Sequence, residues 1–316
     1  MIPAPAMSAS ATPADPLVAR WLRRELAVHP PNARSLVVTI WGDALAPHGG
    51  EVWLASLIRL LAPFAINERL VRTSVFRLAR DGWLAAQTTG RRSRYRLIGE
   101  GAARFAQAYR RVYTPPSHPW DGRWEVVVVP PESMPAKQRL ALRNELAWSG
   151  FGTFAPGVHA RPGVEGEAFV LQAHAVTGGV LRMDAQDVPN GDGGTLAGRV
   201  DAAWPLRELA ADYRRFIARF ARVVEAFRSP GTPSPEQAFL VRSLLVHEYR
   251  RTRLRDPQLP ADLLPLDWPG AAAYALCRDF YRRAHPLALR YLASTFADAG
   301  ETLPPPLPAF DDRFAR

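Results

Sequence analysis

Three prolines and a glycine lie within the ten-residue stretch YTPPSHPWDG, residues 113–122. A regular helix cannot run through this stretch, because proline fixes φ and lacks an amide hydrogen. The chain has 316 residues, which is long enough for two or three domains. We therefore expect a first domain at residues 31–114, a second at residues 120–200 and a third at residues 204–300.

The first thirty residues begin MIPAPAMSASATPADP and are rich in proline and alanine. They lack the apolar core of a secretory signal, and we expect residues 1–30 to be a disordered extension. The single cysteine, Cys277, is expected to be a small buried apolar residue, and a disulfide within the chain is excluded. Because every apolar run is shorter than the roughly 18 residues of a membrane span, we expect a soluble, cytoplasmic protein.

The positive charge is confined to one part of the chain. The net charge is +10, and residues 17–118 contain 16 arginines, no lysine and 6 acidic residues. The remainder is therefore neutral overall. A basic domain joined to a neutral body is typical of a protein that binds a polyanion such as DNA.

The first domain has the pattern of three helices followed by a β-hairpin. The helices are expected at residues 33–45, 51–64 and 66–82, and two short strands are expected at residues 83–88 and 93–97. This order describes a winged helix-turn-helix. In that architecture the third helix enters the major groove, and the hairpin approaches the DNA backbone or the minor groove.

The third helix carries apolar residues on one face and arginines on the other. Val71, Val75 and Leu78 recur at helical spacing and are expected to be buried, whereas Asn67 is a good N-cap. Arginine donors match the O6/N7 edge of guanine and phosphate oxygens, and Thr73 could meet a thymine methyl group or a phosphate. A merely solvated arginine face is the alternative. The predicted DNA-binding residues are Asn67, Arg69, Arg72, Thr73, Phe76, Arg77, Arg80, Arg91, Arg92 and Arg94.

The second domain alternates strand and helix patterns. Four valines in RWEVVVVP, residues 123–130, predict a buried strand, and residues 136–150 predict a helix that ends at Gly150. Strand-like segments follow at residues 151–162 and 167–176, before a loop rich in glycine and aspartate. This α+β order predicts a ferredoxin-like fold.

The third domain is expected to be mainly helical. An aromatic-rich apolar stripe runs through residues 206–228. Ser234 and Gln237 form a predicted capping box with Pro235 at the first helical position, and a last helix is expected from about Gly270 to Ala297.

Several of these segments together resemble one known family. The segments VRTSVFRLARDGW, GFGTFAPGVHARP and VHEYRRTRLRDPQLPADLLPLDWPG are similar, in this order, to the three domains of PaaX-type transcriptional repressors. The resemblance covers roughly residues 30–295, and its central part looks like a Cas2-type ferredoxin fold. It implies a homodimeric repressor of phenylacetate-degradation genes that is released from a two-fold operator by phenylacetyl-CoA or a related acyl-CoA. No cofactor is expected.

The effector site is expected in the HEYRR segment, residues 247–251, and just after it. The predicted residues are His247, Tyr249, Arg250, Arg251 and Arg253. The arginines would bind the phosphates of CoA, while the histidine or tyrosine would line its pocket. Two structural alternatives stay open, in which His247 is a core residue with a satisfied partner and Asp256 pairs with one of the arginines. Trp148, Phe151 and Phe154 could line a pocket for a phenyl group, or could belong to the core.

Catalytic motifs are lacking in the sequence. It has no nucleophile elbow, phosphate-binding loop, dinucleotide fingerprint or metal-ligand spacing of Cys and His, so no catalytic or metal-binding residue is predicted. Two alternatives differ from a ligand-responsive repressor: a metal-dependent nuclease built on the middle domain, and a DNA-binding protein that responds to no effector. Fold likeness alone would not establish the first.

Overall fold

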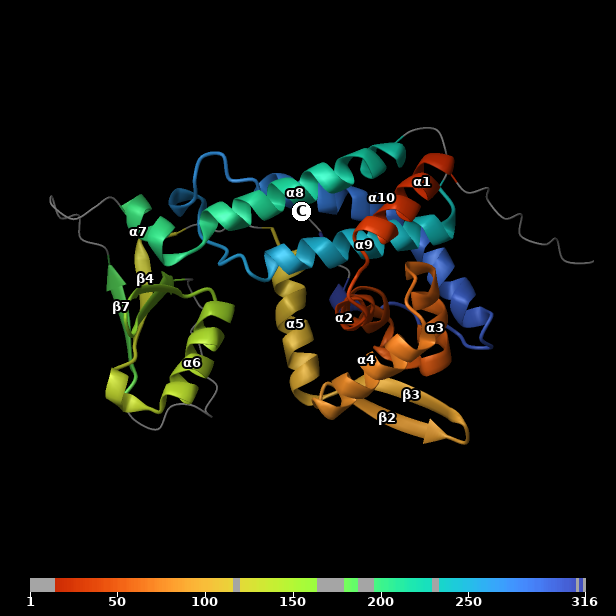
Figure 1. Ribbon diagram of the computed structural model, residues 1–316, viewed down its shortest axis with the longest axis horizontal. Helices are drawn as coiled ribbons and strands as arrows, with labels where there is room; N and C mark the ends of the chain where they lie inside the picture. The colour runs from red at the N-terminus through yellow and green to blue at the C-terminus, as the bar shows by residue number, and fades with distance from the viewer. Residues whose placement is uncertain are drawn as a thin grey trace, which may run out of the picture. The chain divides into compact units, whose positions relative to one another are not determined.

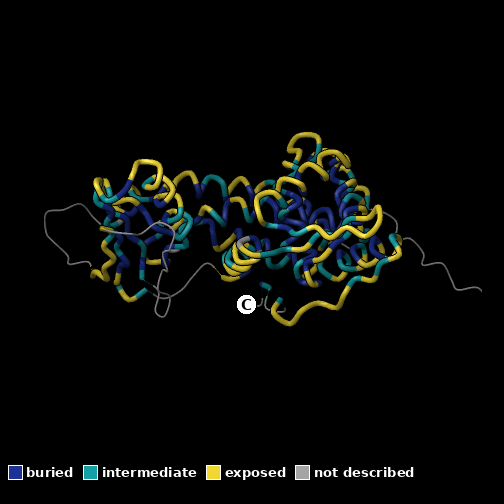
Figure 2. The backbone as a smooth tube through the Cα atoms, turned by 90° about the horizontal axis from the view of Figure 1, so that it is seen from below, coloured by how far each residue is buried: buried dark blue, intermediate teal, exposed yellow. Residues whose placement is uncertain are grey.

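The computed structural model describes residues 15–115, 120–163, 179–186, 196–228, 233–310 and 313–314. Helix and sheet are both present (Figure 1). The chain divides into a first unit, Met1–Thr114, Phe216–Arg250 and Ala275–Arg316, and a second unit, Pro115–Arg215 and Arg251–Tyr274. The residues expected to form a third domain are therefore shared between the two units. Backbone buried inside the first unit appears dark blue in Figure 2.

Helix α1 (Pro16–Val28) replaces part of the expected disordered extension. The Asp15 carboxylate caps it by accepting hydrogen bonds from the amides of Leu17 (2.8 Å) and Val18 (3.1 Å). Val18 and Leu22 are buried, and the ring of Trp21 lies 5.4 Å from that of Phe220. The prediction of disorder is wrong for residues 16–28, because this short amphipathic helix buries an apolar face; residues 1–14 lie outside the described chain.

The next hundred residues form most of the predicted elements. In chain order these are α2 (Ala33–Ile40), a π-helical segment (Trp41–Leu45), a 3-10 turn (Ala46–His48), β1 (Glu51–Trp53), α3 (Leu54–Leu61), a 3-10 turn (Ala62–Phe64), α4 (Glu68–Arg80), β2 (Leu84–Thr89), β3 (Arg92–Leu97) and α5 (Gly99–Tyr113).

The three short strands form one antiparallel sheet in the order β1-β3-β2. Glu51, Val52 and Trp53 were expected to be helical, but they pair with β3 in the register Glu51↔Arg96 to Trp53↔Arg94. Backbone pairing across more than forty residues overrides the local helical pattern here. The strands predicted around the turn are confirmed to within one residue, and Gly90 forms the turn with a φ of 60°.

Helix α4 is fixed to its neighbours by the apolar face read from the sequence. Val71 and Val75 are fully buried, Leu78 is nearly so, and α4 packs against α2 and α3. Helix α4 ends at Arg80, and the chain turns at Gly82, which has a φ of 75°. The backbone amide of Trp83 donates to the Leu78 carbonyl at 2.9 Å. This Schellman-type ending turns the chain directly into the hairpin.

The second unit contains a four-stranded antiparallel sheet of order β5-β6-β4-β7. Its elements are β4 (Arg123–Val128), a 3-10 turn (Pro131–Ser133), α6 (Ala136–Trp148), β5 (Gly152–Ala155), β6 (Val158–Pro162), β7 (Leu181–Gln186) and α7 (Leu196–Ala203). Alternate residues of β4 face two clusters: Val127 packs with Leu142 and Leu146 of α6, and Trp124 packs with Trp204 and Val200.

Two segments of this unit differ from their predicted structure, and a third lies outside the described residues. The segment expected to be one broken strand is a β5–β6 hairpin; its turn residue Gly157 has a φ of 76°, and a Cβ there would lie 2.4 Å from the Val129 carbonyl oxygen. The loop rich in glycine and aspartate was expected at residues 187–198, but α7 begins at Leu196. The predicted strand at residues 167–176 lies outside the described residues.

Three long helices complete the chain. They are α8 (Leu206–Ala226), α9 (Pro235–Arg253) and α10 (Gly270–Ala297), with 3-10 turns at Ala261–Leu263 and Pro308–Phe310. The predicted capping box is confirmed, since the Gln237 amide donates to Ser234 Oγ (3.2 Å) and the Ser234 amide donates to Gln237 Oε1 (3.0 Å). Cys277 is buried, as expected. None of the helices in the described residues is both long and apolar enough to cross a bilayer.

Candidate nucleic-acid interface

The outward face of α4 gathers the residues predicted to contact DNA. Those on the helix are all exposed: Arg69, Arg72, Thr73, Phe76, Arg77 and Arg80. Phe76, the one aromatic residue of this group, has 66% of its surface exposed to solvent. Asn67 has a different role, because its Oδ1 accepts the Leu70 amide at 2.9 Å and so closes the first turn. The helix therefore presents four arginines, a threonine and a phenylalanine.

Two carboxylates that the sequence reasoning did not single out lie beside these arginines. Glu68 Oε1 accepts from Arg72, with Nη2 at 2.6 Å and Nε at 2.7 Å. At the other end of the helix, Asp81 pairs with Arg34 at 2.7 Å and lies 3.5 Å from Arg80. The i,i+4 spacing of Glu68 and Arg72 is visible in the sequence and could have identified the first pair.

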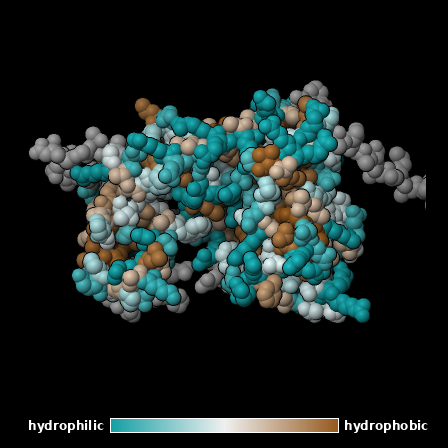
Figure 3. All heavy atoms as spheres, viewed as in Figure 1, coloured by the Kyte–Doolittle hydropathy of each residue, from teal (hydrophilic) through white to brown (hydrophobic). Residues whose placement is uncertain are grey.

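The hairpin carries its own arginines, stacked on a tryptophan of β1. The guanidinium carbons of Arg92 and Arg94 lie 4.5 Å and 4.9 Å from the ring centre of Trp53. Arg94 also pairs with Glu51 at 3.0 Å, and Arg91 is exposed in the turn. In Figure 3 the hairpin ends in hydrophilic side chains. The hairpin and α4 thus both present arginines to solvent.

A carboxylate from the far end of the chain joins this surface. Glu301 follows the end of α10, and its Oε1 accepts the Ser56 hydroxyl at 2.7 Å and lies 3.5 Å from Arg92 Nη2. Its side chain is only 10% exposed, whereas that of Arg92 is 57% exposed. No sequence pattern links residues 245 positions apart, so this contact could not have been predicted.

The segment after α10 makes further contacts with the first unit. The Pro304 carbonyl lies 2.6 Å from His48 Nδ1, and the Leu307 amide donates to the Pro47 carbonyl at 2.7 Å. Phe314 is fully buried, with its ring 5.0 Å from that of Tyr113. We call residues 301–310 and 313–314 the C-terminal strap. It ties α3, α5 and the hairpin to the end of α10.

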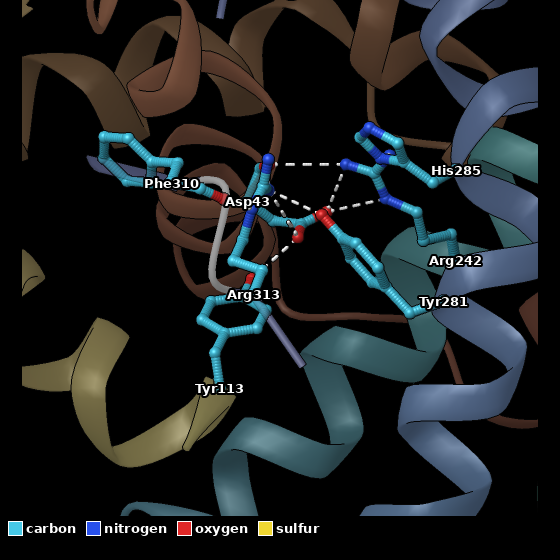
Figure 4. A network of polar contacts seen from close by, with 7 residues as sticks. All are labelled: Asp43, Tyr113, Arg242, Tyr281, His285, Phe310 and Arg313. Atoms are coloured by element: carbon cyan, nitrogen blue, oxygen red, sulfur yellow. Dashed lines mark hydrogen bonds and ion pairs between the residues drawn. The ribbon is translucent and has the colours of Figure 1, made fainter. Parts of the chain in front are cut away.

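A buried ionic network lies between the π-helical segment and the long helices (Figure 4). Asp43 Oδ2 accepts from Arg242 Nη2 (2.7 Å) and Nε (3.0 Å), and its Oδ1 accepts the Tyr113 hydroxyl at 2.7 Å. Arg313 of the strap donates to the Asp43 carbonyl (2.8 Å) and to the Tyr281 hydroxyl (2.5 Å). The network therefore joins α2, through its π-helical extension, to α5, α9, α10 and the strap.

The pKa shifts within the network favour a charged Asp43 and a neutral His285. Burial raises the pKa of Asp43, but the charges of Arg242 and Arg313 outweigh this and the net pKa is lowered. Burial, helped by Arg242, lowers the pKa of His285 to about 4. Arg242 can only donate, so Nδ1 of His285, 3.1 Å from Arg242 Nη1, acts as the acceptor of a neutral imidazole.

The residues predicted to bind an effector are divided between the two units, and His247, Tyr249 and Arg250 belong to the first. His247 is buried with Nδ1 2.8 Å from Thr39 Oγ1, and half-buried Arg250 donates to the same hydroxyl at 2.9 Å. Tyr249 is buried, with its ring 5.6 Å from that of Phe216. The structural alternative that His247 is a core residue with a satisfied partner is thus confirmed.

The two remaining effector candidates belong to the second unit. Arg251 is exposed, whereas Arg253 is 1% exposed and lies 3.4 Å from Asp256. The alternative that Asp256 pairs with an arginine of this segment is therefore confirmed. Asp256 also accepts the Tyr213 hydroxyl at 2.6 Å, so the ion pair is part of the core of its unit.

The aromatic residues considered for a phenyl pocket are also separated. Phe151 is buried with Val127 and Leu146, whereas Phe154 packs at 5.6 Å from both Trp124 and Trp204. Within the described parts of the chain, no three His, Cys, Asp or Glu side chains are grouped so that they could hold a metal ion.

Comparison with known proteins bears on the same regions. Three family descriptions match: PaaX-like protein at residues 32–101, PaaX protein central Cas2-like domain at residues 117–176, and PaaX-like protein C-terminal domain at residues 204–294. The chain is 34% identical over 288 residues, 90% of each sequence, to a protein of Escherichia coli (strain K12) described as transcriptional repressor PaaX.

A solved structure has a similar fold. It is an uncharacterized protein, Rv0674, from Mycobacterium tuberculosis, which is 27% identical, with a TM-score of 0.54 and a match that covers 84% of this chain and 98% of that one. Helix α1 and the C-terminal strap both lie outside the three matched ranges.

Proposed function

Because the chain belongs to the PaaX family of transcriptional repressors, we propose that it represses transcription by binding operator DNA through α4 and the β2–β3 hairpin. In this proposal residues 33–97 form a winged helix-turn-helix, with α2, α3 and α4 as its helices and the hairpin as its wing. Helix α4 enters the major groove, and the wing arginines contact phosphates.

The observation that carries the proposal is the exposed arginine surface of α4 and the wing. Arg69, Arg77 and Arg91 are exposed, and Arg92 and Arg94 are stacked so that their guanidinium groups lie at the surface of the hairpin. Guanidinium groups bind guanine edges and phosphate oxygens in paired hydrogen bonds. Val71, Val75 and Leu78 hold α4 against its neighbours, so its outward face is available to a partner.

The second unit and the long helices serve dimerisation and effector binding in this proposal. The strand order β5-β6-β4-β7 supports a ferredoxin-like arrangement of the second unit. The homodimer would bind a two-fold operator with half-sites separated by whole helical turns. The effector is phenylacetyl-CoA or a related acyl-CoA, and the regulated genes are those of phenylacetate catabolism. Neither cofactor nor catalysis is required.

Effector binding would use Arg250 of the HEYRR segment. Arg250 is half-buried, and its Nη1 donates to the Ser35 carbonyl and to Thr39 Oγ1 of α2. Helix α2 in turn packs against α4. A CoA phosphate drawn to Arg250 would compete with the Thr39 contact, and this competition offers a route from effector to DNA-binding helix.

The test is a gel shift on the DNA that flanks the gene, with the purified full-length protein. Arg77→Ala should weaken specific binding by ~1–3 kcal/mol if Arg77 contacts a base, and Arg91→Ala should mainly reduce the salt dependence. Lys137→Ala, an exposed basic residue of α6, is the matched control and should bind as wild type. Unchanged specific binding by both arginine variants would refute the interface.

The effector is tested by titrating the same complex with phenylacetyl-CoA, with CoA and phenylacetate as separate controls. Release by the thioester alone supports the proposal. By linkage, DNA must weaken thioester binding by the same factor, which calorimetry can measure. If none of a panel of acyl-CoA thioesters releases DNA, the protein is an effector-independent binder.

A further inference from the structure

The outward face of α4 has an apolar centre surrounded by arginines. Arg69, Thr73, Phe76 and Arg80 follow one another at helical spacing along this face, and Arg72 and Arg77 flank them. Of these six residues, only Phe76 is a large apolar side chain, and it is 66% exposed. None of the described aromatic rings packs against it in a ring–ring contact. The ring therefore stands free in the middle of the basic face.

Two neighbours of Phe76 have part of their hydrogen-bonding capacity committed inside the helix. Thr73 Oγ1 donates to the Arg69 carbonyl at 2.8 Å, so its proton is used and its methyl group is the apolar part next to Phe76. Arg72 is held by Glu68. The centre of the face is thus less polar than its ends, where Arg69 and Arg80 stand.

The surrounding charge decides what kind of partner suits this centre. An isolated exposed phenylalanine is common on protein surfaces and by itself indicates nothing. Here, an apolar protein surface docking on Phe76 would have to bury nearby arginine charges at high cost. Duplex DNA satisfies those charges, and in its major groove the thymine C5-methyl is the apolar group displayed on the base edges.

We propose that Phe76, together with the methyl group of Thr73, reads a thymine methyl group in each half-site of the operator. Phe76 is then a specificity-determining residue, and the arginines on either side supply affinity and register. This proposal rests on the proposed function and deepens it. It assigns one base to one side chain, which neither the family resemblance nor the arginine count provides.

The experiment replaces thymine with deoxyuridine, which lacks only the methyl group. The operator is first located by footprinting on the DNA that flanks the gene, and duplexes with one deoxyuridine per half-site are then measured by fluorescence anisotropy. At one position wild type should lose about fourfold in affinity for each methyl group removed, or about fifteenfold for the two half-sites together. Phe76→Ala should bind more weakly to the thymine duplex and be indifferent to that replacement.

A second variant separates loss of reading from loss of folding. Phe76→Leu keeps an apolar side chain and should retain part of the sensitivity to deoxyuridine, whereas Phe76→Gln should lose it. Circular dichroism of each variant should match wild type, since the side chain is exposed.

Three other results would contradict the proposal or the proposed function. Equal sensitivity of wild type and Phe76→Ala at every thymine, or no sensitivity in wild type, would overturn the proposal while leaving DNA binding intact. If Phe76→Ala changed the oligomeric state in solution, Phe76 would be a contact between copies of the chain, and the proposal would be overturned as well. Failure of wild type to bind any footprinted or selected duplex would refute the proposed function itself.

Discussion

Glu301 accepts a hydrogen bond from Ser56 at 2.7 Å and places the same carboxylate oxygen 3.5 Å from Arg92 of the hairpin. The Glu301 carboxylate is nearly buried and therefore fixed in place. The Arg92 side chain is largely exposed and can therefore move. In the DNA-free protein the strap therefore partly neutralises one arginine that the proposed function gives to a phosphate.

Glu301→Gln should tighten DNA binding. The amide oxygen still accepts from Ser56, but the negative charge beside Arg92 is removed. An exposed ion pair is worth ~0.2–1 kcal/mol, so the gain should be up to about fivefold at low salt and smaller at high salt. Glu225→Gln makes the same change in net charge at an exposed pair with Arg228, and is the control. Equal or weaker binding by Glu301→Gln would show that Glu301 does not oppose DNA at this arginine.

Asp43→Asn should strongly destabilise the protein. It leaves two guanidinium groups, Arg242 and Arg313, buried without their carboxylate, a defect that typically costs ~3–5 kcal/mol. Chemical denaturation measures the change. Asp279→Asn, in a partly exposed pair with Arg278, should cost no more than ~1 kcal/mol. A loss at position 43 as small as that at position 279 would mean that the network adds little stability.

Acidification should destabilise the fold through His285. Its pKa is about 4 in the folded protein against 6.5 for a free imidazole. Between these values the unfolded chain takes up a proton that the folded chain does not, so stability falls as the pH drops from about 6.5 towards 4. The Tm of wild type should decrease between pH 7.5 and 5.5.

The contribution of this histidine can be separated from the others. His285→Asn should flatten the pH dependence of Tm, although part of it will remain because burial also lowers the pKa values of His48 and His159. Parallel Tm curves for wild type and the variant would exclude His285 as a source of the acid sensitivity.

Leu22→Ala tests whether α1 belongs to the folded protein. Leu22 is 6% exposed, and truncating a buried leucine typically costs ~2–5 kcal/mol. Leu17→Ala on the same helix, where the side chain is 56% exposed, should have little effect on the denaturation midpoint. If both variants unfolded with wild type, α1 would contribute nothing to the stability of the first unit.

Helix α1 could not be predicted from the sequence. Its composition suggests an extension, and its stability depends on partners about two hundred positions away. Glu25 pairs with Arg219, and the Asp15 amide donates to Gln237 Oε1 at 2.9 Å. A short helix is marginal alone, so these tertiary contacts decide whether it forms.

The sequence by itself determined the elements whose signals are local. The apolar face of α4, its Asn67 cap, the Gly90 hairpin and the Ser234 capping box depend on residues within a few positions of one another, and all are present. The arginine face could be predicted for the same reason. Tertiary structure alone decided which distant charges form pairs: Asp43 with Arg242, and Arg92 with Glu301. Burial and ion pairing depend on the whole packed unit, and the spacing of residues along a chain does not specify which distant carboxylate an arginine will meet.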